Sequence, residues 1–289
     1  MIPITGHTGL TALLGSPVAH SISPLMHNEA FRLLDLDYTY LCFDVNEDTL
    51  ATAVEGLKAC GIRGFNLTMP NKNKIVELLD ELSPAARLIG AVNTVVNDNG
   101  HLTGYNTDGV GYMQAVKDAG YDITGKTITV MGAGGAATAI CAQAALDGVK
   151  KIHIFARETS RFWSRTQKLV ENINSTLPCQ AVLHENKDTA ALSQAIAQSA
   201  LLLNATSVGM APNTDGTIIT DTSLYHPDLI VSDVIYNPRE TRFLREAKEA
   251  GCRTFNGMYM LLYQGAEAFR LWTGKEMPVA EIKAKFFAG

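Results

Sequence analysis

Two serines, Ser21 and Ser23, are separated by a single residue and lie just before the apolar-periodic stretch LMHNEAFRLL. Serine followed by proline is typical of a helix start, because the hydroxyl caps backbone N–H groups and proline suits the first helical position. Ser23 with Pro24 therefore predicts a capped helix, and Ser21 is not needed for that cap. Unpaired N–H groups and the positive dipole end at a helix start also bind anions. The pair is interpreted either as an ordinary cap or as an anion site.

A glycine-rich loop, GAGGAA, follows a β-branched run and opens an alanine-rich helical stretch. In a dinucleotide site the first glycine permits a tight turn, the second lets a pyrophosphate approach the backbone, and the third position keeps the helix against the strand. Gly132, Gly134 and Ala137 occupy these three places. A tight turn without a ligand is the alternative. Because a second strand follows at the required spacing, the loop predicts nucleotide binding.

The second strand ends in FARETSR, where a residue that reads the ribose belongs. Glu158 there could accept the ribose hydroxyls of NAD, whereas Arg157 and Arg161 could hold the 2′-phosphate of NADP. The sequence therefore carries a signal for NAD and a signal for NADP. It slightly favours NAD, because a phosphate beside Glu158 would meet a like charge.

Two β-type runs flank Asn99 and Gly100, a strong signal for a hairpin with a two-residue loop. Such a loop places Asn93 opposite Asn106, with Asp108 just beyond the end of the strand. Polar side chains are therefore expected to gather at this end of the hairpin.

The elements that would position these side chains follow two patterns. In the first hundred residues short β-rich runs alternate with helical stretches, which predicts an α/β layer. From residue 127 the order strand, glycine turn, helix, strand continues through ALLLNATSVG and DLIVSDVIYNP, which predicts a doubly wound sheet. The boundary between the patterns is expected between Asp108 and Tyr121. The tail MYMLLYQGAEAFRLW carries an apolar stripe on one helix face, flanked by Gln264.

Composition excludes several classes of function. The 289 residues are 46% hydrophobic with a formal net charge of -5 and no run dense in lysine or arginine, so neither a nucleic acid nor a membrane partner is expected. No stretch has the length and apolarity of a membrane span, and the first residues lack a signal-peptide pattern, which makes the cytoplasm the expected location. Five scattered cysteines predict reduced thiols, with neither a disulfide nor a structural metal.

Together these stretches resemble the shikimate dehydrogenase family, including its quinate/shikimate dehydrogenase branch. The resemblance is carried, in the family's order and spacing, by HSISP, NLTMPNK, GAVNT, YNTDG, GAGGAA, NATSVGM, IYNP and NGMYMLLYQGAEAFRLW. It implies an α/β substrate domain at 1–110, a Rossmann-type NAD(P)-binding domain at 111–256, and C-terminal helices at 257–289 that pack on the substrate domain. The implied reaction is hydride transfer between NAD or NADP and shikimate or 3-dehydroshikimate, with quinate and 3-dehydroquinate as alternative substrates.

The resemblance also assigns roles to residues of this chain. Substrate binding falls on Ser21, Ser23, Asn66, Thr68, Asn93 and Gln264, with the serine pair holding the ring carboxylate. Cofactor binding falls on Gly132, Ala133, Gly134, Gly135, Ala136, Arg157, Glu158, Arg161, Thr206, Tyr236 and Gly257.

Lys72 and Asp108 match the family's catalytic pair. Oxidation of a secondary alcohol needs a group that takes the hydroxyl proton, which Lys72 would do with Asp108 orienting it. Whether Lys72 acts alone or the two groups titrate as one unit stays open. Lys74 is interpreted as a solvated surface lysine.

The chain departs from the family at two places. Members that use NADP commonly have Asn-Arg-Thr after the second strand, where this chain has Ala156, Arg157 and Glu158. Thr68 stands where a smaller serine would leave more room, which disfavours the extra hydroxyl of quinate.

Two other functions stay open: a sensor that binds shikimate-like ligands without turnover, and a two-domain dehydrogenase acting on another small substrate, such as an amino acid or a folate derivative. Lys72 with Asp108 favours an enzyme over a sensor, and the serine pair favours a shikimate-type substrate. The chain is expected to be a monomer or a homodimer.

Overall fold

The computed structural model describes residues 3–287, which divide into two compact units. Unit 1 runs up to Thr107 and resumes at Leu262, and unit 2 is Asp108–Leu261. The sequence placed the corresponding boundaries after residues 110 and 256. Helix α9 (Met258–Thr273) crosses the second boundary, so the chain returns to unit 1 within a helix.

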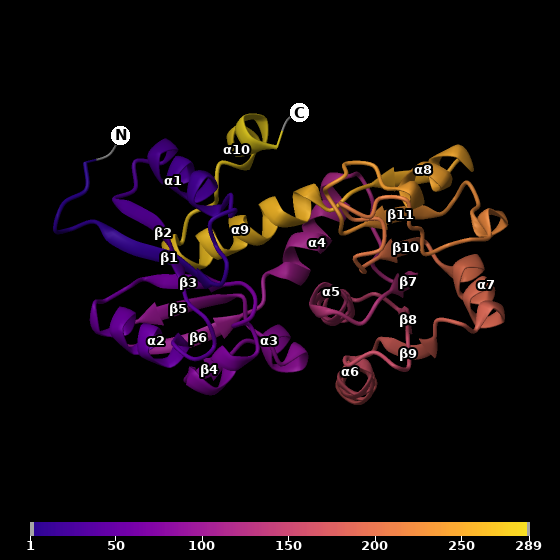
Figure 1. Ribbon diagram of the computed structural model, residues 1–289, viewed down its shortest axis with the longest axis horizontal. Helices are drawn as coiled ribbons and strands as arrows, with labels where there is room; N and C mark the ends of the chain where they lie inside the picture. The colour runs from indigo at the N-terminus through magenta and orange to yellow at the C-terminus, as the bar shows by residue number, and fades with distance from the viewer. Residues whose placement is uncertain (1–2, 288–289) are drawn as a thin grey trace. The chain divides into compact units, whose positions relative to one another are not determined.

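Unit 1 is built on a six-stranded mixed sheet in the order β2-β1-β3-β5-β6-β4. Its strands are β1 (Gly9–Gly15), β2 (Tyr38–Asp44), β3 (Gly64–Leu67), β4 (Glu81–Leu82), β5 (Thr94–Asp98) and β6 (His101–Tyr105). Strands β2, β1 and β3 are parallel, as expected where helical crossovers join them, and β5 runs antiparallel to both β3 and β6. The α/β layer predicted for this region is confirmed (Figure 1).

The predicted hairpin is also confirmed. Strands β5 and β6 pair from Thr94 with Tyr105 to Asp98 with His101, which leaves Asn99 and Gly100 as the loop. Both loop residues have positive φ, at 55° and 94°, as a two-residue hairpin turn requires. This register sets the polar end of the hairpin just before β5 and just after β6.

The helices of unit 1 are α1 (Ser23–Leu33), α2 (Leu50–Ala59), α3 (Pro84–Ile89), α10 (Val279–Phe286) and the unit's share of α9, with a 3-10 turn at Lys74–Leu78. Trp272 of α9 donates from Nε1 to the carbonyl of Val95 at 2.9 Å, and Lys285 of α10 pairs with Glu29 of α1 at 2.8 Å. The C-terminal helices are therefore fixed to the sheet and to α1.

Unit 2 is a six-stranded parallel sheet in the order β12-β11-β10-β7-β8-β9. Its strands are β7 (Thr127–Met131), β8 (Lys151–Ala156), β9 (Gln180–Glu185), β10 (Leu201–Asn204), β11 (Ile230–Asp233) and β12 (Arg253–Phe255). The strand order reverses at β7, which is the doubly wound Rossmann order predicted from the sequence. Ligands of such sheets bind outside the carboxyl ends of the strands at that reversal, here β7 and β10.

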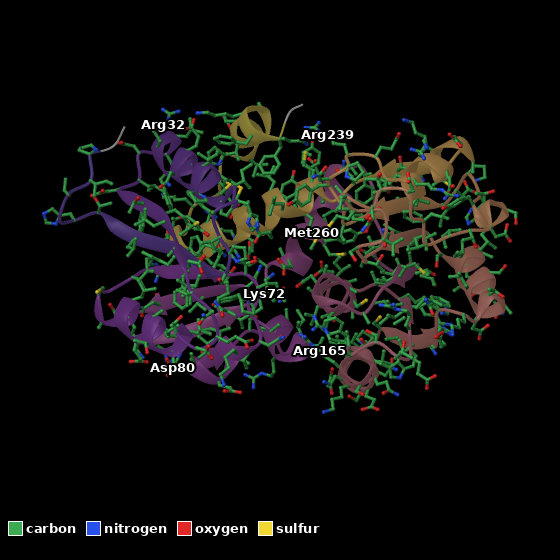
Figure 2. The ribbon with its side chains drawn as sticks, viewed as in Figure 1. Arg32, Lys72, Asp80, Arg165, Arg239 and Met260 are labelled. Atoms are coloured by element: carbon green, nitrogen blue, oxygen red, sulfur yellow. The ribbon has the colours of Figure 1, made fainter. Side chains whose placement is uncertain are left out.

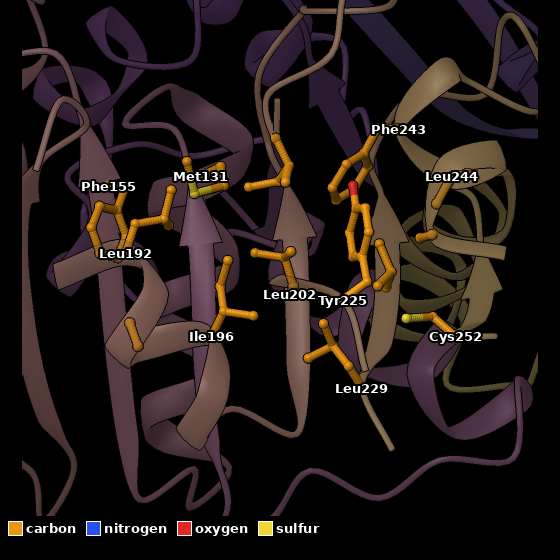
Figure 3. Close-up of a cluster of buried hydrophobic side chains, with 14 residues drawn as sticks. Met131, Phe155, Leu192, Ile196, Leu202, Tyr225, Leu229, Phe243, Leu244 and Cys252 are labelled. Carbon is orange, nitrogen blue, oxygen red and sulfur yellow. The ribbon is translucent and has the colours of Figure 1, made fainter. Parts of the chain in front are cut away.

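The helices of unit 2 are α4 (Asp108–Asp118), α5 (Gly135–Leu146), α6 (Trp163–Thr176), α7 (Thr189–Gln198) and α8 (Arg242–Glu249), with a 3-10 turn at Thr222–Leu224. Figure 3 shows Ile196 of α7 and Phe243 of α8 in a buried cluster with strand side chains such as Met131 and Leu202. This cluster packs helices against the sheet and fixes the strands whose ends carry the nucleotide loop.

Candidate functional site

The start of α1 differs from the predicted cap. Ile22 holds the N-cap position without a side-chain bond, and Ser23 is already the first helical residue. Ser21 Oγ instead accepts the backbone N–H of Ser23 at 3.2 Å. The prediction that Ser23 supplies the cap is therefore wrong, because a hydroxyl two residues ahead reaches this N–H in a local turn.

Replacing Ser21 with alanine is expected to lower the free energy of unfolding by about 1 kcal/mol, since the Ser23 N–H loses its acceptor. Threonine at position 21 keeps a hydroxyl at the same place and should retain most of that stability. Urea unfolding of the two variants measures the difference. Equal losses in both variants would contradict the assignment of the bond to the hydroxyl.

A hydrogen-bonded network in unit 1 connects three of the residues assigned to the substrate. The Tyr40 hydroxyl donates to Asn66 Oδ1 at 2.8 Å, and Asn66 Nδ2 donates to the carbonyl of Asn93 at 3.1 Å. Asn93 Nδ2 lies 3.4 Å from Gln264 Oε1 of α9. The structure thus brings Asn66, Asn93 and Gln264 into one network, with Tyr40 hydrogen-bonded to Asn66.

The turn after β3 carries Thr68 and Lys72. Thr68 donates its N–H to the carbonyl of Leu14 at 3.0 Å, and its methyl group packs so closely on Gly15 that a side chain there would collide with it. The Lys72 carbonyl accepts the Val92 N–H at 2.8 Å, so the backbone at Lys72 is fixed to the segment before β5. Lys72, labelled in Figure 2, is half-buried.

Two neighbours of Lys72 differ in surroundings. Asn71 is fully buried and donates to the carbonyl of Val45 at 2.8 Å, which anchors the turn. Lys74 is exposed and pairs with the Glu77 carboxylate at 2.8 Å. Lys74 is therefore a solvated partner of Glu77.

Asp108 is the first residue of α4 in unit 2 and is half-buried. A carboxylate in the first turn of a helix is stabilised by the positive end of the dipole. The next residue, Gly109, lies directly on α5, since a side chain there would collide with the carbonyl of Ala139. The close packing of α4 on α5 fixes the backbone that carries Asp108.

Unit 2 contains a cleft of about 1310 Å³ at the carboxyl ends of β7, β8, β10 and β11. Its lining includes nine of the residues assigned to the cofactor: Gly132, Ala133, Gly134, Gly135, Ala136, Arg157, Arg161, Thr206 and Tyr236. Among the residues the structure describes, that lining includes neither Glu158 nor Gly257. The arginines that could hold a 2′-phosphate are thus in the cleft wall, and Glu158 is not.

The glycine loop has the shape a pyrophosphate needs. Gly132 has φ of 123°, and a side chain there would lie 2.8 Å from the carbonyl oxygen of Ala205. Gly134 is the N-cap of α5 without a side-chain bond, and the space around Gly134 and Gly135 is open. Backbone N–H groups at the positive end of α5 therefore face open space, which fits a bound phosphate.

A buried carboxylate ties together the two loops that line the cleft after β10 and β11. Asp233 accepts hydrogen bonds from Asn204 Nδ2 at 3.1 Å, from the Ile235 N–H at 2.9 Å and from the Thr241 hydroxyl at 2.8 Å. Burial raises the pKa of Asp233 to about 6. Asn204 Oδ1 in turn accepts the backbone N–H of Thr206 at 3.0 Å. The wall residues Thr206 and Tyr236 are thereby held by groups that lie beneath the cleft.

Gly257 supports this wall from behind. A side chain there would overlap the backbone of Val234, and the Gly257 N–H donates to the carbonyl of Ile235 at 3.1 Å. The sequence assigned Gly257 to the cofactor, whereas the structure places it against the backbone of the segment that lines the cleft.

Sequence reasoning did not single out Tyr40, Thr94, Thr107, Asn204 or Asp233, which hold the site residues. Tyr40 resembles an ordinary core tyrosine in a β-rich run, and only its buried hydroxyl distinguishes it. Asn204 and Asp233 each end a buried strand at the edge of the sheet where ligands bind, which is the signal that could have identified them.

Two features are absent from residues 3–287. No helix is long and apolar enough to cross a bilayer. No group of three or more His, Cys, Asp or Glu side chains is placed to hold a metal ion.

Comparison with known proteins places the chain in a family. A model of the shikimate dehydrogenase substrate binding domain matches residues 13–95, and one of the shikimate 5′-dehydrogenase C-terminal domain matches residues 257–285. Shikimate dehydrogenase (NADP(+)) of Listeria monocytogenes serotype 4b (strain F2365) is 55% identical over 284 residues, which cover 98% of this chain and 97% of the relative. The enzyme of the same name from Streptococcus uberis (strain ATCC BAA-854 / 0140J) is 50% identical over 287 residues, covering 98% and 97%.

Comparison with solved structures points to the same family. The crystal structure of shikimate 5-dehydrogenase from Listeria monocytogenes in complex with shikimate and NAD superposes with a TM-score of 0.95 at 55% identity, covering 97% of each chain. Quinate dehydrogenase from Corynebacterium glutamicum in complex with NAD has a TM-score of 0.85 at 32% identity, covering 97% of this chain and 99% of the other. Identity of this level over nearly the whole length shows that the chain belongs to the shikimate dehydrogenase family.

Proposed function

We propose that this chain interconverts shikimate and 3-dehydroshikimate with a nicotinamide dinucleotide. The observation that carries the proposal is the network in unit 1, which joins Asn66, Asn93 and Gln264 and holds Asn66 on Tyr40. Three amide groups converging in this way suit a polyol better than an apolar or strongly charged substrate. The high identity to shikimate dehydrogenases, one of them solved with shikimate and NAD, supports the same substrate.

The serine pair is proposed to hold the ring carboxylate. Both hydroxyls lie at the start of α1, where the helix dipole favours a negative charge. Asn66 and Asn93 are proposed to bind ring hydroxyls, with Thr68 and Gln264 as further partners. The close packing of Thr68 on Gly15 restricts its movement, which supports shikimate over the larger quinate.

Lys72 is proposed to take the hydroxyl proton when the alcohol is oxidised and to return it in reduction, with Asp108 orienting its ammonium group. A bound nicotinamide dinucleotide would supply the complementary step, accepting or donating the hydride. The fixed backbone of Lys72 and its half-buried side chain support this role, since a proton acceptor must be held in place.

NADP is proposed as the preferred cofactor, with NAD also accepted, in place of the slight preference for NAD drawn from the sequence. Arg157 and Arg161 line the cleft in unit 2, and the guanidinium of Arg161 lies 4.7 Å over the Phe162 ring, which restrains it. Glu158 is exposed and, within the described chain, is not part of the lining. Relatives with 50 to 55% identity carry NADP(+) in their names, whereas the solved Listeria enzyme binds NAD.

Initial rates with shikimate and quinate, each measured against NAD and NADP, test the proposal. We expect the highest kcat/KM with shikimate and NADP. In Arg157→Ala and Arg161→Ala, kcat/KM for NADP should fall by about 10- to 100-fold in at least one variant, the value of a hydrogen bond to a charged group, while NAD is little affected.

Glu158→Gln is the control for the ribose site, because it changes a charge that the structure places outside the lining. It should leave the ratio of kcat/KM for NADP to kcat/KM for NAD within about twofold of the wild-type ratio. A variant with glutamine that gains tenfold in kcat/KM with NADP would show that Glu158 reads the ribose after all. Shikimate binding without turnover under any condition would favour the sensor instead.

A further inference from the structure

The amide of Asn66 has a fixed orientation. Its Nδ2 lies 3.1 Å from the carbonyl oxygen of Asn93 and 2.9 Å from Thr94 Oγ1. Because a backbone carbonyl can only accept, the NH₂ group must lie on this side, and both of its hydrogens are used there. Asn66 Oδ1 therefore faces Tyr40, whose hydroxyl donates to it at 2.8 Å.

The amide of Asn93 is fixed in the same way. Its Oδ1 accepts the backbone N–H of Thr107 at 2.7 Å, and an N–H can only donate. The Thr94 hydroxyl, which accepts from Asn66, has its own hydrogen available for Asn93 Oδ1 at 3.1 Å. The hydrogen bonds thus run in one direction, from Tyr40 through Asn66 and Thr94 to Asn93.

Tyr40 and Thr94 are inside the protein. Tyr40 is 1% exposed and Thr94 is 0% exposed. The Tyr40 ring stacks on His27 with centroids 4.5 Å apart and an angle of 10°, which fixes its hydroxyl. Burial raises the pKa of Tyr40 well above its ordinary value, so the hydroxyl remains a donor. Residues this buried act on a ligand through Asn66.

We propose that Tyr40 and Thr94 are positioning residues that fix Asn66 as a hydrogen-bond acceptor toward the substrate. Asn66 uses both Nδ2 hydrogens on Asn93 and Thr94, so it offers the second lone pair of Oδ1 to a ligand hydroxyl. Asn93 Nδ2 in turn donates to Thr107 Oγ1 at 3.0 Å and lies 3.4 Å from Gln264 Oε1, which holds the amide on which Asn66 rests. A ring that carries a hydroxyl donor beside Asn66 is selected. The inference rests on the proposed function of Asn66.

The test measures shikimate Kd by titration calorimetry in a double-mutant cycle of Tyr40→Phe and Asn66→Ala. Tyr40→Phe keeps the ring on His27 and removes only the hydroxyl. It should raise Kd about tenfold in the wild-type background, the value of one hydrogen bond, with kcat little changed. In the Asn66→Ala background the same change should raise Kd less than about twofold, because the interaction it acts through is gone.

Three further variants separate positioning from general damage. Thr94→Val should raise Kd about tenfold, and Thr94→Ser, which keeps the hydroxyl, should restore it. Tyr38→Phe is the matched control on the same strand, since its ring packs on Phe31, and it should leave Kd unchanged.

The proposal would be overturned by a tenfold effect of Tyr40→Phe that persists in Asn66→Ala, or by equal Kd values for Thr94→Val and wild type. If Asn66→Ala does not fold, the Thr94 pair decides alone. A wild-type protein that does not bind shikimate at all contradicts the proposed function and leaves the fixed orientation of the Asn66 amide in place.

Discussion

Replacing Lys72 with alanine is expected to lower kcat on shikimate by about 10² to 10⁴, the usual value of a positioned proton-transfer group. The alcohol cannot lose its hydride without also losing its hydroxyl proton, and the variant leaves water as the acceptor. Shikimate affinity should change little, because the network of Asn66, Asn93 and Gln264 remains. Initial rates together with calorimetric Kd values separate the two effects.

Lys74→Ala is the matched control, because it removes the same charge two residues away. Lys74 is exposed and paired with Glu77, so kcat should stay within about twofold of wild type. Near-normal turnover in Lys72→Ala, or an equal loss in both variants, would contradict the assignment of the proton to Lys72.

Below neutral pH, His27→Phe is expected to make unit 1 less sensitive to acid. His27 is fully buried, neither ring nitrogen has a hydrogen-bond partner among residues 3–287, and burial lowers the pKa of His27 from 6.5 to about 3. In the unfolded chain the imidazole binds a proton as the pH falls below about 6.5, whereas the folded protein does not until about pH 3. Between those values the free energy of unfolding falls by about 1.4 kcal/mol per pH unit.

The measurement is urea unfolding at pH 7 and at pH 5. Between these two pH values, the difference in free energy of unfolding between wild type and His27→Phe should change by about 2 kcal/mol. The chain has two tryptophans, and in a Trp163→Phe background the fluorescence of the buried Trp272 reports on unit 1. The readout is the slope against pH, so a general loss of stability in the variant does not affect it. If the free energy of unfolding has the same slope against pH in wild type and in His27→Phe, His27 is not held neutral in the folded protein.

The parts of the fold that the sequence predicted correctly depend on local patterns. The hairpin loop at Asn99 and Gly100 follows from two residues that accept positive φ. The doubly wound sheet follows from repeated strand and helix periods with a glycine turn between them. The return of α9 to unit 1 rested on the resemblance, because no local pattern encodes a bond between Trp272 and Val95, 177 residues apart.

The site residues were harder to place because their geometry depends on small offsets and distant partners. Ser21 and Ser23 lie two positions apart, and the cap was assigned to Ser23, whereas Ser23 is already in the helix and its N–H is bound by the hydroxyl of Ser21. Tyr40 meets Asn66 across 26 residues of sequence, which no motif reveals. Glu158 is exposed and, within the described chain, lies outside the lining of the cleft, which a charge argument from the sequence alone could not reveal.

The central claim, that a hydride passes between shikimate and the nicotinamide, is tested most directly with shikimate deuterated at the carbon that carries the reacting hydroxyl. After turnover with wild-type protein and NADP, proton and deuterium NMR of the reduced cofactor should show one deuterium on the nicotinamide ring. The Lys72→Ala protein should transfer the same label more slowly. Deuterium that appears in water instead, or 3-dehydroshikimate formed without label on the cofactor, would contradict the account.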